Sequence, residues 1–280
     1  MPTFSVITVS YNEVKNIQRT LDSIVNQTCL DYELIVVDGG SQDGTKELIC
    51  QYQDSIKWWC SEADRGIYHA MNKGVCHATG DYIIFMNSGD AFYNETVLDV
   101  VLSKGLHADV IEGYVIRTDK NKRLREKYED RYVQLFTDTL SHQGTFIRRE
   151  LLMSHPYDEQ YKIVADWKLW LETIILEQRS YDFIDTTIAY VDMTGISSVN
   201  VEQRLKERDA VIREMFPPAI VRLIQSYQKA YGLALVRYAV ELSEHHPKGY
   251  NIVRKIAKRV TKLSRLVTFI LYYASKQITN

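Results

Sequence analysis

The chain has 280 residues, 45% of them hydrophobic and 25% charged, which excludes a disordered or fibrous protein and predicts a folded body with a substantial core. The formal charge is −2, but eight basic and no acidic residues follow position 247, so the first 247 residues carry −10. An acidic body argues against nucleic acid as a partner. Four cysteines without a C-x-x-C pair, and no signal-peptide pattern, predict a reduced, cytoplasmic protein without structural zinc.

The first 115 residues alternate between predicted strands and helices. Apolar, β-prone runs predict strands at residues 4–10, 32–41, 56–61, 82–86 and 109–116. Apolar residues at helical spacing predict helices between these strands, at residues 14–25, 43–52 and 67–77. Nearly continuous apolar strands separated by helices predict an α/β fold with a mostly parallel, doubly wound sheet that is covered on both faces.

Acidic residues follow three of these predicted strands: Asp38, then Asp64 with Arg65, and finally Asp90. The carboxyl ends of parallel strands share one edge of a sheet, where ligands bind. Turn chemistry alone explains any one of these residues. Three acidic strand ends on one edge instead suit Mn²⁺ or Mg²⁺, bound between protein carboxylates and a nucleotide diphosphate.

Two stretches, SVITVSYNEVKNIQRTLDSIVNQTCLDYELIVVDGGSQDGT and DRGIYHAMNKGVCHATGDYIIFMNSGD, resemble the nucleotide-binding half of family 2 glycosyltransferases, the large inverting group with the GT-A fold. The resemblance is close over residues 4–115 and weaker to about residue 215. It implies one GT-A domain with a Rossmann-like nucleotide-sugar-binding half at 1–115 and an acceptor half at 116–216. A helical C-terminal region follows at 217–280.

The resemblance also implies which residues contact the nucleotide. Asp38 matches the aspartate that holds a uracil-type base, whereas Asp64 and Arg65 match the loop that packs on the nucleoside. The stretch from Ser10 through Tyr11 and Asn12 to Glu13 resembles the first nucleotide-contacting loop. The implied nucleotide-binding residues are Ser10, Tyr11, Glu13, Asp38, Asp64, Arg65, Asn72 and Ser88.

Asp90 matches the last acidic residue of the family's D-x-D-D signature, which implies a contact with Mn²⁺ or Mg²⁺. The sequence departs from that signature because Asn87 and Gly89 replace the other two acids. We therefore expect fewer charged ligands than usual, with weaker metal binding or a lost ribose contact as the consequence.

The second half supplies the residues that the resemblance assigns to the acceptor and sugar side. His142 and Gln143 match a His-Gln pair that faces the sugar site, with a core histidine as the alternative for His142. Asp166 matches the catalytic base, although an aspartate there also suits a helix N-cap. Trp167 is a candidate for stacking on an acceptor sugar, and core packing is the alternative for that residue.

A polar loop at 192–200 precedes a predicted helix at 201–215, for which Asn200 and Gln203 suit a capping box. The loop resembles a flexible family segment near the diphosphate, and a plain connector is the alternative. A helical stretch is expected at 219–242.

The last predicted helix, at 250–274, is amphipathic, with a basic face. Its longest uncharged run is too short to span a bilayer, so the pattern favours attachment to a membrane surface. Docking on the body or at a dimer interface is the alternative.

Together these features predict an inverting hexosyl- or N-acetylhexosaminyltransferase. It would move a sugar from a UDP-sugar to a hydroxyl of a glycan or polyprenyl-linked acceptor in surface polysaccharide biosynthesis, at the inner face of the cell membrane. One alternative is a sugar nucleotidyltransferase, but that needs a Gly-rich segment where this chain has Tyr11, Asn12 and Glu13. The other is a catalytically silent, membrane-attached scaffold of the same fold. The sugar, the linkage and the oligomeric state stay open.

Overall fold

The computed structural model describes residues 2–119, 122–123, 135–192 and 200–231. The chain divides into two compact units, Met1–Glu214 and Met215–Asn280. The first unit contains the sheet and every predicted site residue, and α10 (Pro218–Tyr231) belongs to the second. Residues 193–199 of the polar loop and the basic segment at 250–274 lie outside the described residues. No helix in the described ranges is long and apolar enough to cross a membrane.

The first half of the sheet unit contains the predicted strands and helices, with ends that agree within three residues. In chain order its elements are β1 (Phe4–Ser10), α1 (Ile17–Val25), β2 (Tyr32–Asp38), α2 (Thr45–Gln51), η1 (Gln53–Ser55), β3 (Trp58–Ser61), α3 (Ile67–His77), β4 (Tyr82–Phe85), β5 (Ala91–Phe92) and α4 (Val97–Ser103). The sequence did not predict η1, β5 and α4.

The second half adds shorter elements and one long strand. In chain order these are β6 (Val110–Arg117), β7 (Lys122–Arg123), η2 (His142–Gly144), β8 (Thr145–Arg148), α6 (Arg149–Ser154), α7 (Ala165–Trp170), η3 (Leu171–Leu176), β9 (Tyr181–Val191) and α9 (Val201–Met215). The π-helical turn η3 continues α7 directly.

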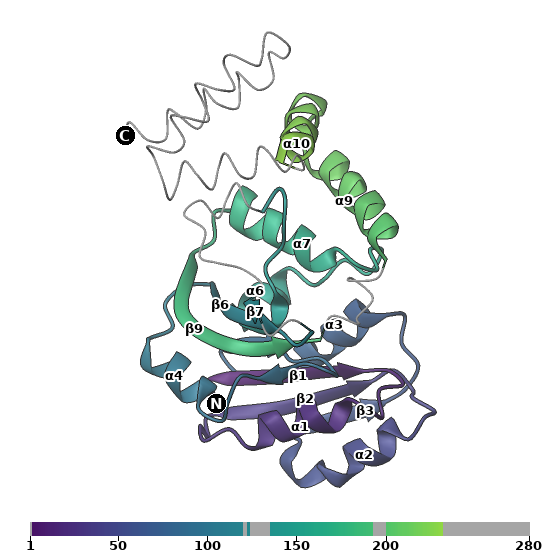
Figure 1. The fold of residues 1–280 in the computed structure, drawn as a ribbon, viewed down its shortest axis with the longest axis vertical. Helices are drawn as coiled ribbons and strands as arrows, with labels where there is room; N and C mark the ends of the chain where they lie inside the picture. The colour runs from purple at the N-terminus through teal and green to yellow at the C-terminus, as the bar shows by residue number, and fades with distance from the viewer. Residues whose placement is uncertain (1, 120–121, 124–134, 193–199, 232–280) are drawn as a thin grey trace. The chain divides into compact units, whose positions relative to one another are not determined.

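Within the described part of the chain, nine strands form one sheet in the order β3-β2-β1-β4-β8-β6-β9-β5, with β7 beside β6 (Figure 1). The four strands from β3 to β4 are parallel, β8 runs antiparallel to both β4 and β6, and β6 is parallel to β9. The predicted α/β fold with a mostly parallel sheet is therefore confirmed. The two predicted halves share this sheet, and the boundary between them at 115 stays a prediction.

Helices cover β1 on both faces, which explains why every residue of this strand is buried (Figure 1). Val6 belongs to the core cluster that includes Leu21 and Ile24 of α1. Burying side chains of that size stabilises the fold by about 2 kcal/mol each. Ile7 faces the opposite layer, where Gly74 lets α3 approach so closely that a Cβ there would lie 2.6 Å from Ile7 Cγ2.

Candidate active site

The carboxyl ends of the parallel strands form a common edge. Ser10 pairs with Asp38 and Asp38 with Ser61, so β1, β2 and β3 end level with one another. The chain after β4 continues beside β1 as far as Ser88, whose N–H donates to Val9 O at 3.2 Å. The buried hydroxyls of Ser10 and Ser88 have no hydrogen-bond partner among the described residues. Such groups are rare in folded proteins, which makes this edge a candidate ligand site.

Asp38 is fully buried at the end of β2 and shapes the loop that follows it. Its Oδ2 accepts the N–H of Ser41 at 2.9 Å and that of Gly40 at 3.2 Å, and also the Ser61 hydroxyl at 2.7 Å. Its Oδ1 accepts the hydroxyl of Ser41. These bonds hold Gly40 at φ +83°, a conformation that favours glycine. The contact of Asp38 with a base stays a prediction.

Gly39 lies between two predicted nucleoside contacts. A Cβ on Gly39 would lie 2.6 Å from Asp64 Oδ2 and 3.2 Å from Tyr11 Cδ2, so only glycine fits there without displacing them. Tyr11 is 63% exposed and presents its ring to solvent. Asp64 Oδ1 accepts the N–H of Gly66 at 2.8 Å, which fixes the carboxylate. The fold thus places an aromatic ring, which can stack on a base, beside a carboxylate, which can accept hydrogen bonds.

The loop after β1 is anchored on the loop after β2. Asn12 has a left-handed backbone, φ 53°, and its N–H donates to Ser41 Oγ at 2.7 Å. The N–H of Glu13 donates to Thr45 Oγ1 at 2.8 Å. The Glu13 carboxylate accepts the side-chain amide of Asn16 at 2.7 Å, just before α1. In this structure Glu13 therefore supports the loop, and its predicted nucleotide contact stays a prediction.

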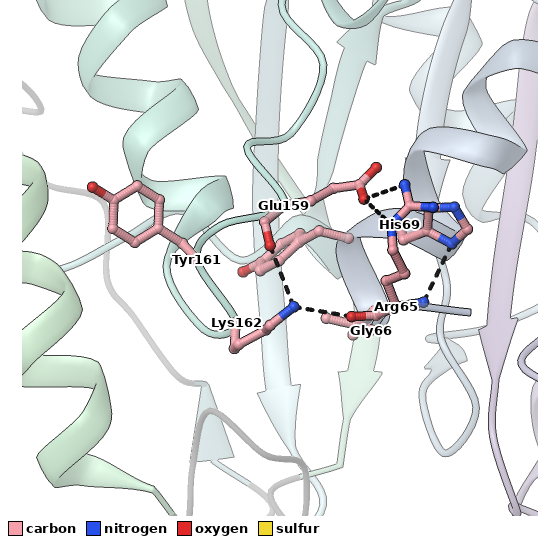
Figure 2. A pocket seen from close by; sticks show the side chains of 8 residues that line it. Arg65, Gly66, His69, Glu159, Tyr161 and Lys162 are labelled. Carbon is pink, nitrogen blue, oxygen red and sulfur yellow. Dashed lines mark hydrogen bonds and ion pairs between the residues drawn. The ribbon is translucent and has the colours of Figure 1, made fainter. Parts of the chain in front are cut away.

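Arg65 lines a small pocket with Glu159 and Lys162 (Figure 2). Its guanidinium donates through Nε and Nη2 to Glu159 Oε2, at 3.1 and 2.7 Å. Lys162 Nζ donates to the carbonyl oxygens of Arg65 and Glu159, at 3.0 and 3.3 Å (Figure 2). The Arg65 side chain is 69% exposed, so a ligand at the sheet edge can compete for it.

Asn72 of α3 is occupied by contacts within the protein. Its amide Nδ2 donates to the carbonyl of Tyr157 at 2.8 Å, and its Oδ1 accepts the N–H of the same residue at 2.9 Å. Asn72 therefore pins the segment around Tyr157 to α3, and its predicted place beside the nucleotide stays a prediction.

Asp90 is the centre of a buried polar group at the same edge and is 3% exposed. Its Oδ2 accepts Gln143 Nε2 at 3.0 Å, and its Oδ1 accepts the N–H of Asp192 at 2.9 Å. Burial raises the pKa of Asp90 to about 6, although the charge of His142 and these two hydrogen bonds lower it. A cation beside this carboxylate would relieve the cost of burying its charge.

Asp192, which the sequence did not single out as a site residue, brings a second carboxylate to Asp90. It follows β9, and a Cβ on Gly89 would lie 3.0 Å from Asp192 Oδ2. The Asp192 carboxylate thus lies over Gly89, the position at which the family signature has an acid. Within the described ranges, no three His, Cys, Asp or Glu side chains are arranged to hold a metal ion. Two carboxylates still fit Mg²⁺ or Mn²⁺, which take further ligands from substrate phosphates and water.

Asp166 lies in the first turn of α7 and is buried. Its Oδ1 accepts the N–H of Trp167 at 2.8 Å and lies 3.0 Å from the hydroxyl of Tyr68. Its Oδ2 faces Nδ1 of His142 at 3.8 Å. The structure thus places Asp166 beside His142, as expected if both serve one site.

His142 also contacts Asn87, the second position at which this chain lacks a family acid. Nε2 of His142 lies 3.0 Å from Asn87 Nδ2, an amide nitrogen that can only donate. Nδ1 of the same ring faces Asp166 Oδ2. Asn87 replaces an acid with a group that orients His142.

Trp167 does not have the exposed ring face that stacking on an acceptor sugar requires. It is 1% exposed, and its Nε1 donates to the carbonyl of Leu135 at 2.6 Å. The guanidinium of Arg208, from α9, lies 4.7 Å from the centre of its ring. Core packing, the alternative reading of Trp167, therefore describes this structure, and we do not assign the residue to the acceptor.

Comparison with known proteins identifies relatives of the chain. The protein family described as Glycosyl transferase family 2 matches residues 5–158. A PGL/p-HBAD biosynthesis glycosyltransferase of Mycobacterium bovis is 29% identical over 248 residues, which cover 85% of this chain and 96% of the relative. An uncharacterized glycosyltransferase of Mycobacterium tuberculosis is 41% identical over 205 residues, which cover 70% of this chain and 78% of the relative.

Solved structures share the fold at low sequence identity. TarS (1–349) of S. aureus, solved in complex with UDP, has a TM-score of 0.64 and 18% identity, covering 84% of this chain and 73% of TarS. The mannosyltransferase PcManGT of Pyrobaculum calidifontis, in complex with GDP-Man and Mn²⁺, has a TM-score of 0.60 and 16% identity. That match covers 99% of this chain and 86% of PcManGT.

Proposed function

Because the chain belongs to glycosyltransferase family 2, we propose that it is an inverting enzyme that moves a sugar from a nucleoside diphosphate sugar to an acceptor hydroxyl. One observation carries this proposal. His142 and Gln143 are neighbours in η2, and they reach Asp166 and Asp90 respectively. The carboxylate proposed as the base and the one proposed to hold the cation therefore lie on either side of a single turn.

The proposed donor is a UDP-linked hexose or N-acetylhexosamine. The exposed ring of Tyr11 would stack on the base, while Asp64 lies beside it across Gly39. Arg65 follows Asp64 directly, and its exposed guanidinium would contact the nucleotide. The complexes of TarS with UDP and with UDP-GlcNAc support the choice of a uridine nucleotide.

Asp90 and Asp192 would hold the divalent cation, Mn²⁺ or Mg²⁺. When bound, the cation supplies positive charge that stabilises the departing diphosphate. The position of the Asp192 carboxylate over Gly89 supports this assignment. So does the complex of PcManGT with Mn²⁺.

Asp166 would act as the general base in one in-line displacement. The acceptor oxygen forms a bond to the anomeric carbon, the bond from that carbon to the diphosphate oxygen breaks, and the carboxylate takes the hydroxyl proton. The acceptor must enter from the side opposite the diphosphate, which inverts the configuration of the sugar. The proposed acceptor is a glycan or polyprenyl-linked intermediate of surface polysaccharide synthesis. The proposed place of action is the cytoplasmic face of the membrane, where the basic residues of the 250–274 segment would bind.

Release of UDP tests the proposal. The purified chain is incubated with a panel of UDP- and GDP-sugars and of glycan and polyprenyl-linked acceptors, with and without Mn²⁺, and free nucleotide is measured. We expect release from one UDP-sugar that depends on the metal, and we expect Asp166→Asn to fold and to bind UDP normally but to lose release. Metal-dependent binding of UDP without release from any donor would favour the silent scaffold instead.

A further inference from the structure

The two oxygens of the Asp166 carboxylate have different surroundings. Oδ1 accepts the N–H of Trp167 at 2.8 Å and lies 3.0 Å from the Tyr68 hydroxyl. Oδ2 faces only Nδ1 of His142 among the described residues, at 3.8 Å, which is longer than a hydrogen bond. The carboxylate is therefore held through one oxygen, and the other is available to take a proton.

Tyr68 reaches Asp166 from the opposite half of the domain. It is the second residue of α3, and its buried hydroxyl lies 2.8 Å from the carbonyl oxygen of Ile163 and 3.0 Å from Asp166 Oδ1. Burial, together with the negative charge of Asp166, holds the pKa of Tyr68 well above its ordinary value. The phenol therefore keeps its proton, and both of its neighbours are acceptors.

A neighbouring tyrosine shows that packing alone does not require this contact. The rings of Tyr68 and Tyr157 lie 5.2 Å apart, and both side chains are buried. The hydroxyl of Tyr157 has no hydrogen-bond partner among the described residues. The two phenols occupy one aromatic cluster, but only the hydroxyl of Tyr68 lies within hydrogen-bond distance of the carboxylate.

We propose that Tyr68 is a positioning residue that holds Oδ1 of Asp166, so that Oδ2 faces the acceptor hydroxyl. This inference rests on the proposed function, in which Asp166 is the base. Tyr68 itself would not touch the substrate. It follows Gly66 by two residues, so one end of α3 would support both the loop proposed to pack on the nucleoside and the proposed base.

Tyr68→Phe and Tyr157→Phe form a matched pair, because each removes one buried hydroxyl from the same cluster. The probe is the pair of UDP-sugar and acceptor with which the unaltered protein releases UDP fastest. We expect Tyr68→Phe to lower kcat roughly ten- to hundredfold, the effect of a misplaced catalytic group. We expect KM and the Kd for UDP with Mn²⁺ to change less than twofold. Tyr157→Phe should retain kcat within twofold.

Equal kcat values for the two variants would overturn the inference and leave the transferase function standing. So would a rise in KM for Tyr68→Phe at unchanged kcat, because a positioning role acts on the chemical step.

If the unaltered protein releases no nucleotide, the proposed function fails. Thermal unfolding then still tests the contact between the Tyr68 hydroxyl and the Asp166 carboxylate. Tyr68→Phe should lower the melting temperature more in the native background than in Asp166→Ala, which removes the acceptor oxygen, whereas Tyr157→Phe should act equally in both. Equal shifts for Tyr68→Phe in both backgrounds would show that the hydroxyl and the carboxylate do not interact, which would overturn the inference.

Discussion

Replacing Gly39 by alanine tests the nucleoside site with little effect on the fold. The new Cβ would lie 2.6 Å from Asp64 Oδ2 and 3.2 Å from Tyr11 Cδ2. Ordinary contact begins at about 3.4 Å, so the carboxylate would move by about 0.8 Å. Both groups belong to side chains that can shift, Asp64 by lengthening its hydrogen bond from Gly66 N–H, and Gly39 does not have a positive φ. The free energy of unfolding should therefore change by less than about 1 kcal/mol.

Donor binding should change much more, because the shift displaces two groups proposed to contact the nucleoside. Losing one hydrogen bond to a charged group costs about 1.5–3 kcal/mol, which weakens UDP binding roughly ten- to hundredfold. Calorimetric titration of UDP in the presence of Mn²⁺ measures this change. Wild-type affinity in Gly39→Ala would refute the placement of the nucleoside between Tyr11 and Asp64.

Gly74→Ala is the control, because it should lower the stability of the fold and leave the binding of UDP unchanged. Its Cβ would lie 2.6 Å from Ile7 Cγ2, inside the core beneath α3. Overpacking of about 1–3 kcal/mol outweighs a gain in helix propensity of about 1 kcal/mol. The melting temperature should fall while the affinity for UDP stays unchanged.

Three further outcomes follow from the structure. Asp192→Asn should weaken Mn²⁺ binding in the presence of UDP roughly tenfold, as should Asp90→Asn, measured by calorimetry, because each removes one of two carboxylate ligands. Glu214→Gln should lower the free energy of unfolding at pH 7 by about 1 kcal/mol after allowance for solvent screening. Hydrogen bonds from Lys168 and Tyr161 lower the pKa of Glu214, so its stabilising contribution is present above the ordinary pKa of 4.5. Denaturant titrations should therefore show that the difference in free energy of unfolding between the unaltered protein and Glu214→Gln disappears as the pH falls through the lowered pKa of Glu214. Trp167→Ala should lower the free energy of unfolding by about 3–5 kcal/mol, as expected for a core tryptophan.

The sequence predicted the first half of the sheet well because the apolar pattern of each strand lies within a few consecutive residues. β1 and β2 are rich in Val and Ile, and both strands are buried along nearly their whole length. In contrast, β8 has four residues and enters between β4 and β6 in the reverse direction. Nothing local fixes such an insertion, since it depends on pairings between residues far apart in the chain.

The contact of Gln203 N–H with Asn200 Oδ1 at 3.4 Å bears out half of the expected capping box.

The apolar pattern located the site residues at the ends of the predicted strands, and the resemblance alone supplied His142, Gln143 and Asp166, whereas Asp192 was not named. Asp38 and Asp90 stand at strand ends that the apolar pattern locates. Asp192 comes from 102 residues further along the chain and meets Asp90 only because β9 pairs with β5. Burial of Trp167 under Arg208 is equally long-range. A sequence motif can suggest Trp167 as a site residue, but the exposure of its ring depends on how the whole chain packs.

A crystal structure of the chain with UDP and Mn²⁺ is the most direct test of nucleotide binding at this edge of the sheet. The anomalous signal of manganese should lie within coordination distance of the carboxylates of Asp90 and Asp192. The uracil ring should lie against Tyr11 and Asp64, with Asp166 on the far side of the diphosphate. Manganese or uridine bound elsewhere on the protein, with Asp166 facing neither, would contradict the proposed glycosyl transfer at this site.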